Sequence, residues 1–548
     1  MKKESCLVYS QLCERGIQNY GLAPAYDGAG VEELVFSLDA YKSYYVLEHG
    51  ASVKDYEDYC DKLLKNGFSL YSSKSSNGNS FATYTDGENI VNVSHISYKD
   101  VDRYVVRDIS YMSIAVDSTK NSALPPKGEN FEEITTLQVS MIDGFVIRLT
   151  DGRFLVIDSG LNREHIIEAI YGELCRQNVR EGKPVVAAWM FSHAHCDHVD
   201  AFIEILKRYG DKIEVQTVIH GFPAHDTYSG KNYMEYYMDK ESEAMTARSN
   251  EIKRLMDETM PEGRFVIAHT GQIFEYPGVR LEIVFTAENL YRQQMFDTNA
   301  SSVVYMLTMA GGKMLALGDA VDIASKAIRR IHGKELSCDL VVLAHHAYNG
   351  GDEEMYHNTG AKVAIWPNLL EDIEEKGLVG DLANHFDVYS VKHNLIMSRN
   401  EPVMTLREGM TESELAPFAR KLEANRWDAV DYDARQNPKN FITEAQLEAG
   451  LGIAPRYYGK GEETETLEIN DADKTYTITL DGVTEYNFDY YCNTLKRDGY
   501  QRKDKREEDG KTSVIYACPR NSVYVDFIPT DARIVIKVGP AGVNTLEY

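Results

Sequence analysis

The feature that most constrains this chain is the stretch FSHAHCDHVD, residues 191–200. Four potential metal-binding side chains lie within six positions: His193, His195, Asp197 and His198. The apolar run PVVAAWM precedes them and predicts a buried strand, whereas AFIEILKRYG after them has the spacing of a helix that ends at a glycine. The chain must therefore turn from a strand into a helix at this cluster of donors.

The spacing of the four side chains predicts two adjacent metal ions. Imidazole nitrogens and a carboxylate oxygen suit zinc, manganese or iron. His193 and His195 are two apart at the end of a strand, so their side chains point the same way. Asp197 and His198 follow where the chain bends into a helix that we expect to start near Val199. Their donor atoms can then face a second ion beside the first.

A second constraint is an internal repeat near the two ends of the chain. The segment YCDKLLKNGFSLY (59–71) recurs as YCNTLKRDGYQRK (491–503), and a gapless shift of 432 residues extends the match to both sides. Each copy has the pattern of a strand, a helix and about three further strands. We therefore expect one small α+β module at each end, and these modules could form a homodimer or pair with each other within one chain.

The segments between the copies alternate strand-like and helix-like patterns, which favours a mixed α/β central domain. FVIRLTDGRFLVIDSG predicts a two-stranded hairpin, and residues 233–259 predict a long polar helix. The expected organisation is an N-terminal segment, module copy 1, the central domain, a charged helical connector and module copy 2, with the bounds 1–34, 35–110, 130–400, 401–465 and 466–548.

The composition of the chain indicates which classes of binding partner and which location to expect. The 548-residue chain has 58 Lys and Arg against 85 Asp and Glu, a net charge of −27, which disfavours a phosphate-backbone partner and favours a small substrate. No apolar run approaches the roughly 20 residues that span a bilayer, and no signal peptide is expected. The eight cysteines are scattered without a CxxC pair, which indicates reduced thiols and a cytoplasmic location.

The order of motifs resembles the metallo-β-lactamase-fold hydrolase superfamily, which implies an αββα four-layer sandwich over about residues 130–400. FLVIDSG is similar to the first motif of that family, in which Asp158 would orient the histidines by hydrogen bonding. MLALGDA resembles the motif of the bridging aspartate, here Asp319. LVVLAHHAYNGG resembles a later histidine motif with His345 and His346.

The chain departs from this family at one position. Many members carry a third histidine just after the strand that here reads VRLEIVFT, but this chain continues AENLYRQQ. His220, His225 and His269 lie nearby in the sequence, but none of them directly follows this strand. The run NASSVVYMLTMAGGKMLALGD followed by AHHAYNGG instead resembles the branch that includes the hydrolase domain of DNA-uptake competence proteins and the cell-wall phosphorylcholine esterases.

The branch resemblance implies further ligands. His345 is expected to ligate a metal, and His346 to touch the substrate or the second ion. His385 in LANHFDVYS is the candidate for the last ligand of the second ion, with His393 as its competitor.

The resulting hypothesis is a binuclear metallohydrolase in which two divalent ions share a hydroxide. The ions would be zinc, with manganese or iron as alternatives. The hydroxide would attack a small phosphodiester or related phosphoester. Asp197 would also accept the proton of the bridging water, and His346 or a tyrosine of the end modules would protonate the leaving group. Two alternatives stay open: hydrolysis of a carboxylic ester, lactone or thioester, and a non-catalytic metal-binding scaffold that acts through its end modules.

Overall fold

The structure is a computed structural model of the whole chain. It describes all residues except 1–22, 29–30, 39–42, 103–104, 121, 126–135, 143, 223–236, 291–297, 310–311, 348–350, 352, 362, 368–394, 399–402, 408–450, 452–463, 498–499, 509, 519–520 and 541–548. The fold is mixed α/β, and internal contacts divide it into two units: Met1–Tyr98 with Ser110–Glu423, and Lys99–Ile109 with Ala424–Tyr548. No helix in the described part is long and apolar enough to span a membrane.

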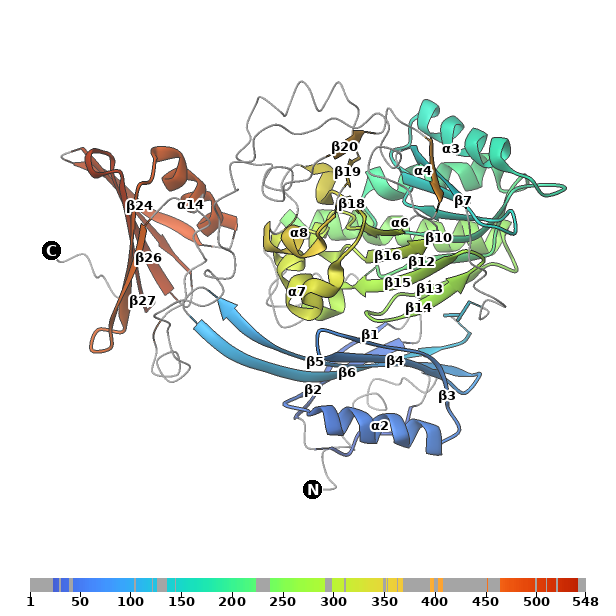
Figure 1. The fold of residues 1–548 in the computed structure, drawn as a ribbon, viewed down its shortest axis with the longest axis horizontal. Coiled ribbons are helices and arrows are strands. Elements are labelled where there is room, and N and C mark those ends of the chain that lie inside the picture. The colour runs from blue at the N-terminus through green and yellow to red at the C-terminus, as the bar shows by residue number, and fades with distance from the viewer. Residues whose placement is uncertain are drawn as a thin grey trace. The chain divides into compact units, whose positions relative to one another are not determined.

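Two large sheets form the centre of the first unit (Figure 1). The first sheet has the order β13-β12-β10-β9-β8-β7-β21, with β11 paired to β10. Its strands are β7 (Thr136–Ile142), β8 (Gly144–Arg148), β9 (Phe154–Ile157), β10 (Val185–Met190), β11 (Glu214–Val215), β12 (Thr217–His220), β13 (Arg264–Ile267) and β21 (Val403–Arg407). The strands from β9 through β10 and β12 to β13 pair parallel with one another. The strands from β9 through β8 and β7 to β21 pair antiparallel.

The second sheet runs in chain order from β14 to β20. Its strands are β14 (Ile273–Tyr276), β15 (Val279–Phe285), β16 (Val304–Met309), β17 (Gly312–Ala316), β18 (Leu340–Val342), β19 (Val363–Trp366) and β20 (Leu395–Ser398). The strands from β14 to β17 pair antiparallel, and those from β17 to β20 pair parallel. The parallel strands therefore end at one common edge of the sheet.

Alternation along the strands divides the core into two clusters. On β10, Met190 belongs to the cluster formed by side chains of both sheets, whereas Trp189 belongs to the cluster that includes the helices. These helices are α3 (Glu164–Gln177), α4 (Cys196–Tyr209), α6 (Tyr237–Thr259), α7 (Asp322–His332) and α8 (Glu353–Thr359). Short 3₁₀ turns complete the unit: η1 (Ala287–Leu290), η2 (Thr298–Ser301), η3 (Gly333–Leu336) and η4 (Ala344–Ala347).

Two segments differ from the sequence-based expectations. The helix expected near Val199 begins at Cys196, so Asp197 and His198 lie in its first turn. Residues 403–407, expected in a helical connector, form strand β21 because the unpaired edge of β7 accepts them as an antiparallel partner. Most of the remaining connector lies outside the described residues.

Two six-stranded sheets near the chain ends share one topology. The first contains β1 (Val31–Leu38), β2 (Ser43–His49), α2 (Val53–Lys65), β3 (Ser69–Ser76), β4 (Asn79–Thr85), β5 (Asn89–Asp102) and β6 (Val105–Ser118). The second contains β22 (Thr464–Asn470), β23 (Thr475–Asp481), α14 (Glu485–Arg497), β24 (Gln501–Glu508), β25 (Lys511–Ala517), β26 (Asn521–Ile528), the 3₁₀ turn η6 (Pro529–Asp531) and β27 (Arg533–Pro540). Their orders, β1-β2-β6-β5-β4-β3 and β22-β23-β27-β26-β25-β24, correspond strand by strand. In each sheet one face packs against the helix (Figure 1).

The local geometry of the two modules also corresponds at positions 432 apart. The backbone N and Oγ of Ser52 lie 2.8 and 2.6 Å from the carboxylate of Asp55 at the start of α2. The backbone N and Oγ1 of Thr484 lie 2.8 and 2.6 Å from the side-chain oxygen of Asn487 at the start of α14. Both arrangements satisfy amide groups at a helix N-terminus. A common origin of the modules stays a prediction that this geometry favours.

Buried polar contacts fix the N-terminal module to α7 and to His269, which follows β13, within the first unit. Ser76 Oγ lies 2.9 Å from His332 Nδ1, and Asn79 Nδ2 donates to the carbonyl of Ile331 at 2.6 Å. His269 lies between two carboxylates, 2.9 Å from Asp117 Oδ2 on β6 and in contact with Glu288 on η1. Burial alone would lower the pKa of His269, but these two carboxylates raise it to about 10.

This ion cluster predicts a pH-dependent stability. Below about pH 6.5, the usual histidine pKa, the folded and unfolded chains both hold the proton of His269 and the stabilisation is complete. As pH rises toward 10, the unfolded chain has released the proton while the folded chain retains it, so stability falls by up to about 1.4 kcal/mol per pH unit. Thermal unfolding between pH 7 and 10 should show a shallower decline for His269→Gln than for the unmodified protein.

The matched control is His220→Gln, because burial lowers the pKa of His220 to about 4, below the tested range. This variant should keep the pH slope of the unmodified protein whatever its absolute stability. Equal slopes for His269→Gln and the unmodified protein would contradict the assignment.

Candidate metal centre

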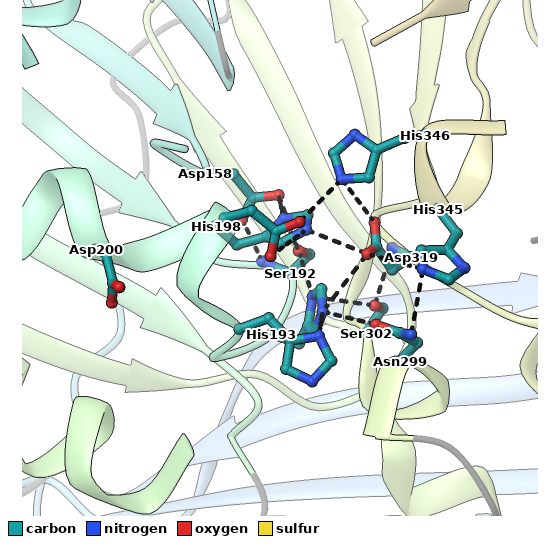
Figure 2. A network of polar contacts seen from close by, with 12 residues as sticks. Asp158, Ser192, His193, His198, Asp200, Asn299, Ser302, Asp319, His345 and His346 are labelled. Atoms are coloured by element: carbon teal, nitrogen blue, oxygen red, sulfur yellow. Dashed lines mark hydrogen bonds and ion pairs between the residues drawn. The ribbon is translucent and has the colours of Figure 1, made fainter. Parts of the chain in front are cut away.

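The clustered donors lie where strands of both central sheets end. His193 and His195 follow β10, and Asp197 and His198 occupy the first turn of α4. Asp319 follows β17, and His345 and His346 follow β18 in η4. The carboxyl ends of strands in α/β sheets are the usual place for ligand sites. Figure 2 shows His193, His198, Asp319 and His346 directed toward one another.

The carboxylate of Asp158 organises the first part of the site. Asp158 follows β9 and has a φ of 53°. Its Oδ1 accepts from the backbone N of Ser192 at 2.8 Å, and its Oδ2 accepts from Ser192 Oγ at 2.8 Å and from His198 Nδ1 at 2.9 Å. The orienting role that the sequence resemblance implies for Asp158 is thus consistent with its contacts to His198 and to the residue before His193.

The donor atoms fall into two groups that share Asp319. One group is His193, His195 and Asp319, and the other is Asp197, His198, Asp319 and His346; within each group the atoms lie within 4.8 Å of one another. Asp319 Oδ2 is 3.7 Å from His193 Nε2 and 3.3 Å from His198 Nε2. Asp319 is thus within reach of the imidazoles of both groups.

Each of four imidazoles has its other nitrogen near a partner outside these groups. Ser192 Oγ lies 3.1 Å from His193 Nδ1, and Thr298 Oγ1 lies 2.7 Å from His195 Nε2. Asp158 contacts His198 Nδ1, and the carbonyl of Pro367 lies 3.3 Å from His346 Nδ1. Such contacts are typical of metal-binding histidines, because they fix the ring orientation and the tautomer. The opposite nitrogen of each ring is thereby directed toward the cluster.

Unusual backbone conformations bring the parts of the site together. Six described non-glycine residues have a positive φ, and three of them are Asp158, His345 and His346. Gly318 also has a positive φ of 53°, and a Cβ there would lie 2.5 Å from Ser192 Cβ. Only glycine therefore allows the turn before Asp319 to approach Ser192. Each such non-glycine conformation costs on the order of 1–3 kcal/mol, and concentrations of them are typical of functional sites.

The electrostatics favour a cation. Burial opposes ionisation of Asp319, but the neighbouring imidazoles of His198, His346 and His193 together outweigh it and hold the pKa of Asp319 well below its ordinary value. Burial likewise opposes charge on His198, yet Asp319 and Asp158 raise its pKa well above the ordinary value. A positive charge at this point is therefore stabilised from two sides.

The donor set fits divalent metal ions. His198 Nε2 is buried and, although Asp319 Oδ2 lies 3.3 Å away, it makes no hydrogen bond of favourable geometry within the described part of the chain. A buried polar atom without a partner is costly, and an ion between His198 and Asp319 would remove that cost. Imidazole and carboxylate donors in this proportion suit zinc, manganese or iron.

The structure places most of the sequence-predicted site residues together. His193, His195, Asp197, His198 and Asp319 belong to the two groups, and so does His346. His345 belongs to neither group, and its Nε2 lies 3.9 Å from Asp319 Oδ2. The expectation that His345 rather than His346 is the metal ligand stays a prediction. His385 and His393 lie outside the described residues.

Sequence reasoning missed Ser192, Thr298, Asn299 and Ser302. Asn299 Oδ1 lies 3.1 Å from His193 Nε2, and Ser302 Oγ accepts from the backbone N of Asp319 at 3.0 Å. The signal was present in the run TNASS before β16, which places several small polar residues beside an apolar strand. Those residue types are common in turns, so the run alone did not distinguish a site.

The likenesses of this chain to known proteins are distant ones among solved structures. No protein-family model and no curated protein matches the chain. Among solved structures, a mutant of the CmlA beta-hydroxylase has 11% sequence identity to this chain and a TM-score of 0.25. The match covers 53% of this chain and 49%, about half, of the hydroxylase chain. The hydrolase AbOPH, described as in the beta lactamase superfamily, matches 45% of this chain and 75% of its own, with 12% identity and a TM-score of 0.22. Likenesses at this level do not establish the fold or the function of this chain.

The contacts of Asp158 predict its contribution to metal binding. Asp158→Asn should preserve the shape and tolerate the positive φ, but it removes the charge that orients His198. We expect zinc affinity to fall about 10–100-fold, as measured by chelator competition. The control is Asp200→Asn, because Asp200 lies on α4 away from the cluster (Figure 2) and pairs with Arg248. Equal affinities in both variants would show that Asp158 does not act on the metal ligands.

Proposed function

We propose that the protein is a metal-dependent hydrolase with two divalent ions, and that its central domain is an αββα four-layer sandwich of the metallo-β-lactamase type. The observation that carries the proposal is the convergence of four imidazole nitrogens and two carboxylates, with the opposite nitrogen of each ring near a partner. The resemblance of the HxHxDH, Asp158 and Asp319 motifs to that superfamily supports it independently.

The two donor groups suggest which residues would hold each ion. His193 and His195 would hold one ion, and Asp197, His198 and His346 the other, with Asp319 between them. His346 Nε2 lies 3.3 Å from Asp197 Oδ2 and 3.8 Å from Asp319 Oδ1. This position favours a role for His346 as a metal ligand over a role as the general acid. The ions would be zinc, with manganese or iron as alternatives.

The accessible side of the cluster is suited to proton transfer. Divalent ions, when bound, lower the pKa of a water molecule to about 7 and neutralise charge that develops on an oxyanion. Asp197 is the most accessible carboxylate of the cluster, with a side chain that is 37% exposed against 4% for Asp319. This difference in exposure supports a role for Asp197 as the group that accepts a proton from the attacking water and releases it to solvent, while Asp319 stays buried.

The proposed substrate is a small phosphodiester or related phosphoester. The motif run from TNASS to AHHAYNGG resembles a branch that includes phosphorylcholine esterases, which supports a phosphorus centre. The net charge of −27 opposes binding of a long phosphate backbone, because that binding requires many Lys and Arg. A compact substrate that reaches the ions directly avoids this repulsion.

The first test is hydrolysis of bis(p-nitrophenyl) phosphate by the purified protein with added zinc and then manganese. Asp197→Ala removes a ligand and the proposed proton acceptor together, so turnover should disappear. The metal-free thermal midpoint should change little, because Asp197 is partly exposed. Full activity in this variant would refute the assignment. Metal binding without turnover on phosphoesters, carboxylic esters or lactones would favour a scaffold instead.

His346→Gln separates a ligand from a general acid. Because His346 Nε2 faces two carboxylates, we expect the variant to lose at least about tenfold in affinity for one of two ions, as measured by titration calorimetry. Retention of both ions, with a loss of turnover that grows as the leaving group becomes more basic, would instead assign protonation of the leaving group to His346.

A further inference from the structure

We propose that Asn299 is a ligand of the ion held by His193, His195 and Asp319, at the place where the sequence lacks the third histidine. This inference rests on the proposed metal-dependent function. It adds a donor that neither the histidine and carboxylate motifs nor the two donor groups include.

The first support is the side of each ring that Asn299 contacts. Residues that only orient a metal-binding histidine contact the nitrogen opposite the metal, as Ser192 does at His193 Nδ1 and Thr298 does at His195 Nε2. Asn299 instead lies 3.1 Å from His193 Nε2, the nitrogen that faces Asp319. Its amide therefore lies on the metal side of the ring.

The other end of the Asn299 amide, its nitrogen, approaches a second imidazole. Asn299 Nδ2 lies 3.4 Å from His345 Nε2, and Asp319 Oδ2 lies 3.9 Å from that nitrogen. Asp319 Oδ2 is also 3.7 Å from His193 Nε2. The Asn299 amide and the Asp319 carboxylate thus approach the same two nitrogens, and Figure 2 shows all four side chains around one space. Asn299 Oδ1, which faces His193 Nε2, is the atom that would bind the ion.

The location of Asn299 explains how it could replace a histidine. It is a buried residue of η2, between β15 and β16, and so follows the strand after which the third histidine was expected. The preceding residue, Thr298, contacts His195, and Ser302 Oγ, just after the turn, accepts from the backbone N of Asp319 at 3.0 Å. The turn is therefore attached to the cluster on both sides of Asn299, which limits the positions of its side chain.

The types of donor atom also predict which metal ion this position prefers. His193, His195 and Asp319 supply three protein donors and a catalytic ion keeps a further position for water, so Asn299 would add a fifth donor. An amide oxygen is a harder donor than imidazole and suits manganese relative to zinc. Asn299 should therefore reduce the preference of this position for zinc over manganese, compared with a histidine at the same place.

A purely structural role predicts a different behaviour. If Asn299 only formed hydrogen bonds with His193 Nε2 and His345 Nε2, it would occupy the nitrogens that an ion needs. Removal of the side chain would then leave ion affinity unchanged or raise it. Ligation predicts the opposite sign, so ion binding without any assay of activity distinguishes the two roles.

The experiment measures the affinities of the full-length protein for Zn²⁺ and Mn²⁺ by titration calorimetry, with the absorption spectrum of the Co²⁺-loaded protein as a second readout. Asn299→Ala should lower the affinity for one of two ions about tenfold or more and change the Co²⁺ bands. Asn299→Asp should restore binding, and Asn299→His should raise the ratio of zinc to manganese affinity. The matched control Asn289→Ala, on the neighbouring turn η1 and bonded to Thr270, should change neither readout.

The outcomes separate this inference from the function on which it rests. If the unmodified protein binds no divalent ion, the proposed function fails first. If it binds two ions and Asn299→Ala binds them with unchanged affinity and an unchanged Co²⁺ spectrum, the function stands and ligation by Asn299 is overturned. Loss of binding in both Asn299→Ala and Asn289→Ala would also overturn it, because a general disturbance of the turns would then explain the effect.

Discussion

The carboxylate of Asp158 is the interaction on which the rest of the site depends. It joins the end of β9 to Ser192 after β10 and to His198 on α4 through three hydrogen bonds of 2.8–2.9 Å. A buried carboxylate is tolerated only when its oxygens are satisfied, so loss of any donor would be costly. The same three bonds set the distance between His193 and His198. The two halves of the HxHxDH motif therefore take one relative position because one buried charge requires it.

The second sheet completes the site through strained turns. Gly318 lets the turn before Asp319 approach Ser192, and the backbone N of His345 donates to the Gly318 carbonyl at 3.0 Å. His345 and His346 both adopt left-handed conformations, which cost free energy unless neighbouring contacts hold them. The Tyr356 hydroxyl provides such a contact, because it accepts from the backbone N of Ala344 at 2.9 Å. The donors therefore converge in the protein itself, and little reorganisation is needed to bind ions.

The parts of the site that the sequence predicted are those encoded locally. HxHxDH after an apolar strand, and aspartates at strand ends, place their own side chains within a few residues. The start of α4 was predicted three residues late because its N-cap, His195, makes no side-chain capping bond and so lacks the usual signal. Asn299 was missed because its partner His193 is 106 residues away. Strand β21 was missed for the same reason, since only pairing with distant β7 identifies it.

The two end modules show that a shared fold does not imply a shared use. In the first module, Ser76 and Asn79 are fully buried against α7. A shift of 432 residues places Glu508 and Lys511 at these positions, and Glu508 is exposed while Lys511 pairs with Asp526 inside its own module. Charged side chains resist burial without a partner, so the second module cannot form the same contact. The attachment of the first module therefore depends on a few substituted positions of β3 and β4 and not on the topology that the modules share.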